Sequence, residues 1–132
     1  GFVEKSHLEE IDDIICRIIK KEHLTIIKDG KEFDIYFNQI AYIEYSLRDT
    51  TIYLNNNSKI KLSEKSLSLL SKELDDRFYQ INRNIIINLD MDPIYNKGTV
   101  KINHNEFQVS RRNQKDLKIK ILERSIYNAR NI

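Results

Sequence analysis

The feature of the sequence that most constrains its fold is a set of short alternating runs separated by turn signals. Phe33, Ile35 and Phe37 alternate with polar residues, which is the period of a half-buried strand. The dipeptide Asp29-Gly30 before this run is a strong signal for a hairpin turn. Further short runs follow, with an asparagine-rich turn among them. Residues 24–62 therefore predict about five short antiparallel strands.

Beyond these strands the sequence predicts a short helix and then a second hairpin. Leu67, Leu70 and Leu74 are spaced as one buried face of a helix. The segment 82–90 stays ambiguous, because its isoleucine run suits a buried strand or a buried helix equally well. Alternation on both sides of Asn103 predicts the second hairpin.

An amphipathic helix is expected near each end of the chain. Residues 6–22 place leucine and isoleucine at three- and four-residue steps after a capping-box sequence. The last helix is expected to open near Asn113 and to turn Leu117, Ile121 and Leu122 inward.

Composition and motifs exclude several classes of function. The chain has only three glycines and no catalytic or phosphate-loop motif, so we predict no enzyme and no cofactor. The histidines His7, His23 and His104 are far apart, which predicts no metal site. The single cysteine, Cys16, cannot form an internal disulfide and fits a cytoplasmic setting. No apolar run approaches the ~20 residues of a membrane-spanning helix.

Charge is distributed unevenly along the sequence. Residues 81–132 contain ten basic and five acidic residues, a net charge of +5, whereas the whole chain has +2. Such an asymmetry suggests a polyanionic partner for this end of the chain, although a solvated basic helix would give the same count.

Three polar clusters carry residue types that suit nucleic acids. Arginine and asparagine can pair with base edges, whereas lysine, serine and helix N-termini suit phosphate oxygens. Structural roles are the alternative. Arg77, Arg83 and Arg111 can form surface ion pairs, and the asparagines can form turns. The clusters are residues 46–51 with Arg48 and Thr50, Asn82-Arg83-Asn84, and Ser110-Arg111-Arg112-Asn113 followed by Lys115, Lys118 and Lys120.

At these clusters the sequence resembles the LytTR DNA-binding domain, which is found at the C-terminus of LytR/AgrA-type bacterial response regulators. The resemblance covers about residues 24–122 and depends on the order and spacing of four degenerate pieces. They are Ile40-Ala41-Tyr42-Ile43-Glu44, Ser66-Leu67-Ser68-Leu69-Leu70, the segment from Phe78 to Asn88, and Val109-Ser110-Arg111-Arg112.

This resemblance implies a mainly β fold and a mode of DNA binding. The family builds about ten short strands into small antiparallel sheets around a short helix, and here an N-terminal amphipathic helix and a C-terminal helix would be added. It has no helix-turn-helix, and its loops enter successive major grooves. The implied function is sequence-specific binding of double-stranded promoter DNA at tandem half-sites, with a second copy alongside.

The resemblance also implies roles for individual residues. The candidates for base contact are Arg48, Thr50, Arg83 and Arg112. The candidates for contact with the DNA backbone are Asn84, Ser110, Arg111, Asn113 and Lys115.

The first residues resemble the end of a receiver domain. Phe2-Val3-Glu4-Lys5-Ser6 precedes the leading helix, and Lys5 would match the receiver lysine that contacts the phosphoryl group. We therefore expect residues 1–23 to be the end of a receiver domain or a linker helix, and residues 24–132 to be the DNA-binding domain. A sensor histidine kinase would then act through the rest of the receiver, outside this sequence.

The alternative is a β-rich module that docks a protein partner and binds no DNA. That function requires Tyr42, Tyr45 and Tyr53 to form an exposed apolar patch instead of joining the core.

Overall fold

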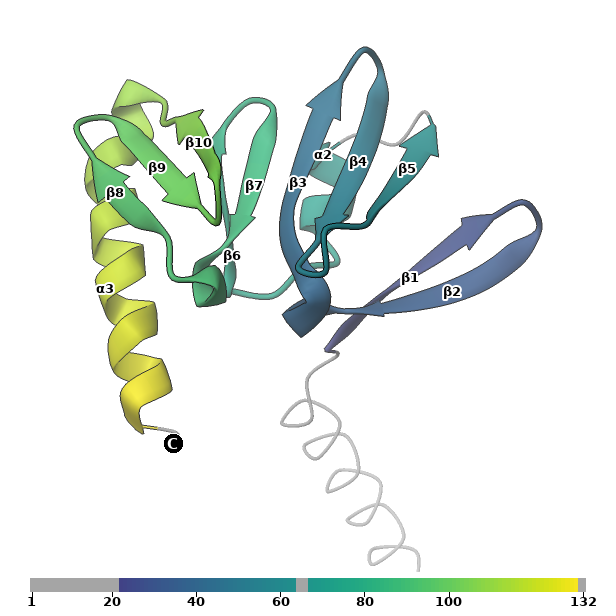
Figure 1. The fold of residues 1–132 in the computed structure, drawn as a ribbon, viewed down its shortest axis with the longest axis horizontal. Helices are drawn as coiled ribbons and strands as arrows, with labels where there is room; N and C mark the ends of the chain where they lie inside the picture. The colour runs from purple at the N-terminus through teal and green to yellow at the C-terminus, as the bar shows by residue number, and fades with distance from the viewer. Residues whose placement is uncertain (1–21, 64–66, 131–132) are drawn as a thin grey trace, which may run out of the picture.

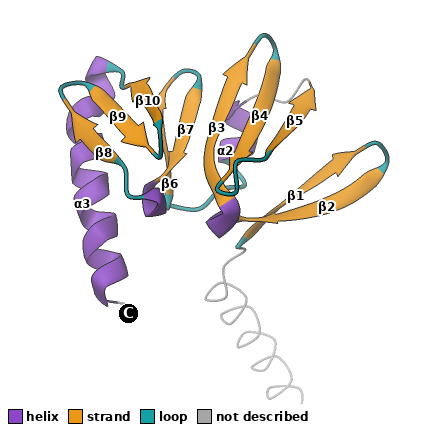
Figure 2. Cartoon of the chain, viewed as in Figure 1, coloured by secondary structure: helices purple, strands orange, loops and turns teal. Residues whose placement is uncertain are grey.

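The computed structural model describes residues 22–63 and 67–130, which form ten strands in three antiparallel sheets (Figures 1 and 2). The predicted mainly β architecture, with its short helix and its C-terminal helix, is confirmed. The leading helix and the receiver-like segment lie outside the described residues. The strands are β1 (His23–Lys28), β2 (Lys31–Tyr36), β3 (Ile40–Ser46), β4 (Asp49–Leu54), β5 (Lys59–Ser63), β6 (Phe78–Asn82), β7 (Ile85–Asn88), β8 (Ile94–Asn96), β9 (Thr99–Ile102) and β10 (Asn105–Gln108). The helices are α2 (Leu67–Ser71) and α3 (Gln114–Arg130), with short 3-10 turns η1 (Phe37–Gln39), η2 (Leu89–Met91) and η3 (Arg111–Asn113).

The β1–β2 hairpin forms as the turn signal predicts. Asp29 and Gly30 both have positive φ, at 54° and 74°. That backbone matches the right-handed twist of the two strands, and asparagine, aspartate and glycine tolerate it best. Ile35 is buried as expected, whereas Phe33, nearer the turn of this two-stranded sheet, is 46% exposed.

A five-stranded sheet in the order β5-β4-β3-β7-β6 forms the middle of the domain. Strand β7 resolves the ambiguous isoleucine run, because both of its faces are covered. Ile86 belongs to one apolar cluster, and Ile85 and Ile87 belong to the other. A short strand that is buried on both sides needs no alternation of apolar and polar residues. Hydrophobic periodicity therefore cannot distinguish it from a buried helix.

Two apolar cores lie on the two sides of this sheet. The first packs the β1–β2 hairpin and α2 against one face, around Phe37, Ile43 and Leu70. The second packs the sheet β10-β9-β8 and α3 against the other face, around Ile102 and Leu117. In Figure 1, α3 runs along the outer edge of the domain beside β8 and β9. The second core therefore includes the first turn of α3 through Leu117.

One predicted orientation in α3 is wrong. Leu117 is fully buried and Ile121 packs against the second core, but Leu122 is 62% exposed. Leu117 and Ile121 are four residues apart and lie on the same side of the helix, whereas Leu122 is rotated by a further ~100°, toward solvent.

A buried asparagine ties the end of β7 to the segment that leads into β3. Asn88 at the end of β7 is fully buried, and its side-chain amide donates to the carbonyl oxygens of Ile40 (2.8 Å) and Phe37 (3.2 Å). Its side-chain oxygen accepts from the amide of Asp90 at 2.9 Å. Because every polar atom of the side chain has a partner, its burial carries no unpaired-group penalty.

Candidate nucleic-acid interface

Three turns that contain the predicted site residues gather at one end of the domain, the upper end in Figure 1. Leu47 and Arg48 form the turn between β3 and β4, and Arg83 and Asn84 form the turn between β6 and β7. The amide of Tyr45 donates to the carbonyl oxygen of Asn84 at 2.8 Å, which holds these two turns beside each other. The third segment is the loop into α3.

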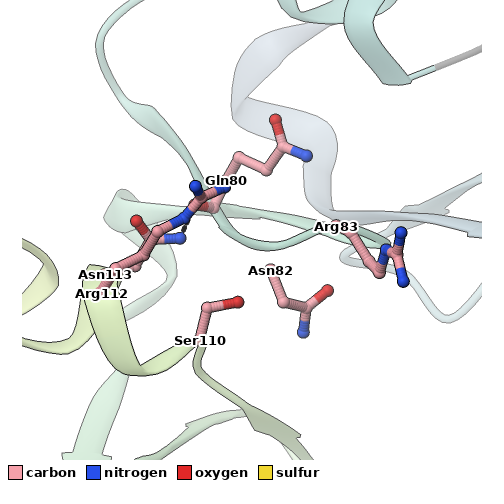
Figure 3. A pocket seen from close by; sticks show the side chains of 6 residues that line it. All are labelled: Gln80, Asn82, Arg83, Ser110, Arg112 and Asn113. Atoms are coloured by element: carbon pink, nitrogen blue, oxygen red, sulfur yellow. Dashed lines mark hydrogen bonds between the residues drawn. The ribbon is translucent and has the colours of Figure 1, made fainter.

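That third segment and the β6–β7 turn enclose a polar hollow of about 250 Å³. Figure 3 shows its six lining side chains, with Arg83 and Arg112 on opposite sides and the Ser110 hydroxyl pointing inward. The structure thus brings together residues that are almost 30 positions apart in the sequence. The lining residues are Gln80, Asn82, Arg83, Ser110, Arg112 and Asn113.

Hydrogen bonds fix the two walls of the hollow against each other. The amide of Ser110 donates to the carbonyl oxygen of Ile81 at 2.9 Å, and the Asn113 side chain donates to the same oxygen at 3.3 Å. The Asn82 side chain donates to the carbonyl oxygen of Gln108 at 2.7 Å. Asn113 is half-buried and its amide is used in this way, so it positions the loop more than it offers itself to DNA.

A tyrosine anchors the first turn of α3 behind the hollow. The Tyr79 hydroxyl donates to Oδ2 of Asp116 at 2.9 Å, joining β6 to α3. Burial, together with this hydrogen bond, raises the pKa of Tyr79 to about 12. The phenol therefore keeps its proton and this bond at every physiological pH.

The arginines around the hollow remain available for a ligand. Within residues 22–63 and 67–130, no ion pair joins Arg48, Arg83, Arg111 or Arg112 to an acidic side chain. The ion-pair interpretation holds for Arg77 alone, whose Nε lies 2.9 Å from Oδ2 of Asp75. Four exposed guanidinium groups that have no acidic partner among the described residues suit a polyanion.

Thr50 does not belong to this surface, and its prediction as a base contact needs correction. It lies within β4, opposite Tyr45 and Leu62, and is completely buried. The two-residue period of a strand puts it on the same face as Ile52, which is part of the first core. The turn itself consists of Leu47 and Arg48 only.

Leu47 is a surface residue that no pattern in the sequence singles out. It is 93% exposed, and it and Arg48 have positive φ values of 53° and 71°. Residues other than glycine, asparagine and aspartate seldom adopt this conformation, and such strain clusters at functional sites. An exposed leucine in a strained turn beside Arg48 is therefore a candidate for apolar contact with a ligand.

The other predicted backbone contacts surround the hollow. Asn84 is exposed in its turn, and its amide donates to the side-chain oxygen of Asn82 at 2.7 Å. Arg111 and Lys115 are exposed on η3 and on the first turn of α3. Lys115 does not line the hollow and lies on the first turn of α3, two residues after Asn113.

The tyrosine patch required by the alternative function does not form. Tyr42 is 8% exposed and stacks on Tyr53, with ring centroids 4.4 Å apart, and the Phe107 ring is tilted against it with centroids 4.7 Å apart. Burial raises the pKa of Tyr42 to about 12. Tyr45 packs against the first core. These aromatic rings stabilise the domain and leave no apolar docking face there.

Other classes of site are not seen in the part of the chain that the structure describes. No three His, Cys, Asp or Glu side chains come together as metal ligands among these residues. None of the described helices is long and apolar enough to cross a bilayer.

Comparisons with known proteins agree with the geometry. The sequence matches the family of LytTr DNA-binding domains over residues 31–122. No curated protein matches the chain. A solved LytTr DNA-binding domain from Bacillus cereus is 16% identical, with a TM-score of 0.61, and the match covers 77% of this chain and 98% of that one. At this identity the likeness concerns the fold, and it confirms the predicted architecture. The family match spans most of the sequence, so the chain belongs to the LytTR family and is a DNA-binding domain.

Proposed function

We propose that this chain binds duplex DNA sequence-specifically, as the effector domain of a two-component transcriptional response regulator. Two copies would occupy tandem promoter half-sites, with the turns of each copy in successive major grooves. The proposal includes two further expectations. Residues 1–23 would be the end of a receiver domain or a linker helix, and a sensor histidine kinase would phosphorylate that receiver.

The observation that carries the proposal is the polar hollow with Arg83 and Arg112 on its two sides. Both guanidinium groups lack an acidic partner among the described residues, and both rise from a backbone held by hydrogen bonds. Arginine pairs with guanine O6 and N7 through two parallel bonds, which requires a side chain that starts from a fixed position.

Different residues would perform different tasks in the complex. Arg48, Arg83 and Arg112 would contact bases, and Leu47 would contact a thymine methyl group. Arg111, Lys115, Ser110 and Asn84 would contact phosphate oxygens, which position a protein without reading sequence.

The test is selection of binding sites from a pool of random-sequence duplexes, carried out with the whole chain at two salt concentrations. Enrichment of a repeated short motif, with affinity falling steeply as salt rises, is the expected result. Salt-sensitive binding with no enriched motif would reduce the domain to a general polyanion binder. No binding would contradict the proposal.

A matched pair of variants makes the selection sharper. Arg83→Ala and Arg112→Ala should each change the enriched motif, because each removes a base contact. Arg130→Ala removes the same charge at the far, exposed end of α3 and should leave the motif as it is.

A further inference from the structure

The outer face of α3 carries an apolar stripe that no described part of the chain covers. Ile119, Leu122 and Ile126 are 46%, 62% and 46% exposed, and the helical repeat places them on the side away from the second core. Lys115 and Arg130, both exposed, lie on the same side of the helix at the two ends of the stripe. The stripe is therefore an apolar surface with positive charge at both ends.

The outer face of the β1–β2 hairpin has the complementary character. One face of the hairpin packs on the first core, and the pairing register places every second residue on the opposite, outer face. There Ile27 is 74% exposed and Tyr36 is 54% exposed. The two lysines of the hairpin, Lys28 and Lys31, are opposite each other and belong to the inner face. Two exposed carboxylates share the outer face, those of Glu32 and Asp34.

The charges on the two surfaces remain available to a partner. No ion pair joins Lys115 or Arg130 to an acidic side chain among the residues that the structure describes. Asp34 accepts from the Thr25 hydroxyl at 2.8 Å and lies 3.8 Å from His23, but its side chain is still 54% exposed. Two other lysines of α3 have contacts within the domain and are left out of the surface. They are Lys118, 5.0 Å from the centroid of the Tyr95 ring, and Lys120, 3.9 Å from Glu123.

The two surfaces also match in length. Ile119 and Ile126 are seven residues apart, which is about 10 Å along a helix. Tyr36 is opposite His23, four residues before Ile27, which is about 13 Å along a strand. Two α3 stripes would bring like charges together, and so would two hairpins, whereas a stripe on a hairpin joins opposite charges.

The two surfaces lie at opposite edges of the domain, with the recognition turns between them (Figure 1). The first core holds the hairpin on one face of the central sheet, and the second core holds α3 on the other. The β3–β4 turn, the β6–β7 turn and the loop into α3 follow one another in a row across the domain. The proposed function places these turns in successive major grooves, so the row follows the duplex axis. Each edge then faces a neighbouring copy along the DNA.

We propose that the α3 stripe of one copy docks on the outer face of the β1–β2 hairpin of the next copy along tandem half-sites. The inference rests on the proposed function and adds the contact between copies. Half-sites in direct orientation bring unlike edges together, as this head-to-tail contact requires. The interface is small, so it forms on DNA and contributes cooperativity there. Because a head-to-tail contact leaves one stripe and one hairpin free, it can continue to a third copy.

The test measures binding of the whole chain to duplexes with one, two or three selected half-sites. Their centres are a whole number of helical turns apart, which keeps the copies on one side of the duplex. Wild type should bind two direct half-sites cooperatively, by about 5- to 150-fold, and a third should add a similar gain. Opposite orientation of two half-sites should abolish the gain, and so should an insertion of half a turn, about 5 base pairs.

Variants of the two surfaces identify the contact. Leu122→Glu and Ile27→Glu should each abolish cooperativity and leave single-site affinity intact. An equal mixture of these two chains should restore part of it, because one chain supplies an intact hairpin and the other an intact stripe. Arg130→Ala should reduce cooperativity without changing the half-site motif, since Arg130 contacts no base. Ile94→Glu, which changes a 65% exposed isoleucine on β8, is the control and should have no effect.

Several results would overturn the inference. They are full cooperativity in either glutamate variant, failure of the mixture to recover any, and cooperativity confined to half-sites in opposite orientation. A large loss of stability in the free Leu122→Glu or Ile27→Glu chain, measured by urea unfolding, would also overturn it, because another part of the same chain would then cover that face. Loss of specific single-site binding by wild type would instead contradict the proposed function.

Discussion

The side-chain amide of Asn82 donates a 2.7 Å hydrogen bond to the carbonyl oxygen of Gln108, and this bond ties the turn bearing Arg83 to the segment that leads to Arg112. The Asn82 side-chain oxygen also accepts from the amide of Asn84. This asparagine is therefore one of the residues that hold the two walls of the polar hollow together. The predicted base contacts depend on a residue that need not touch DNA.

Asn82→Ala should weaken both the fold and DNA binding to a limited extent. Loss of its hydrogen bonds should cost about 1 kcal/mol of stability and roughly fivefold in affinity for the selected half-site. Urea unfolding and a binding titration measure the two effects. Asn105→Ala, at an exposed asparagine of β10, is the control and should change neither. Unchanged affinity in Asn82→Ala would show that the hollow does not need this tie.

Arg112→Ala should weaken binding to the cognate site by about 1–3 kcal/mol and flatten the preference at one base pair. The reason is the loss of a bidentate contact to a base edge. Titrations against the selected half-site and its single-base variants measure this. Equal losses on cognate and random DNA would make Arg112 a phosphate contact.

Lys115→Ala should reduce affinity uniformly across sequences. Lys115 is exposed at the helical edge of the hollow, where an ammonium group meets phosphate and not bases. The plot of log affinity against log salt should become shallower by about 1. A salt slope equal to that of wild type would remove Lys115 from the interface.

Leu47→Asn should stabilise the domain by about 1 kcal/mol, because asparagine tolerates the positive φ of this turn. Affinity for the selected half-site should fall, while affinity for random duplex should stay the same. Unchanged specificity in Leu47→Asn would mean that Leu47 makes no contact with a base.

Asp90→Asn should remove part of the acid sensitivity of the fold. Burial opposes ionisation of Asp90, but hydrogen bonds from Arg124, with Nε at 2.7 Å, and from Asn128 outweigh it and lower its pKa. Because the pKa of Asp90 is lowered in the folded state, its ionised carboxylate stabilises the fold at pH values above the ordinary pKa of 3.8. This contribution is lost as the pH falls through the pKa of the folded state.

This pair is half-buried, so the substitution should cost about 1–2 kcal/mol at neutral pH. Near pH 3 the difference between variant and wild type should become smaller. Urea unfolding at both pH values measures it, and a constant difference would contradict the role given to Arg124.

The sequence predicted those parts of the fold that depend on local chemistry. The Asp29-Gly30 hairpin follows from residues that prefer positive φ, and the buried face of α2 follows from the spacing of Leu67 and Leu70. The Leu47–Arg48 turn has no such residue, since pairing of β3 with β4 imposes its conformation. The polar cluster over residues 46–51 therefore suggests a longer loop than the structure has, and Thr50 lies in a buried strand instead.

The candidate site could be predicted in residue types but not in detail. Arginine and asparagine clusters and the family motifs point to three segments, and the structure brings these segments to one end of the domain. That Asn82 and Asn113 hold the backbone, while Arg83 and Arg112 stay without acidic partners, depends on contacts between residues about 30 positions apart. No local pattern contains that information.

The most direct test of the central claim is an NMR titration of the labelled chain with a duplex that carries the selected half-site. The backbone amides of Arg48, Arg83 and Arg112, and the Nε–H signals of these arginines, should shift most. The turn at Asp29-Gly30, in the separate β1–β2 sheet, should stay unchanged. Shifts centred on that hairpin, with the arginines of the hollow unaffected, would contradict the assignment of DNA recognition to this end of the domain.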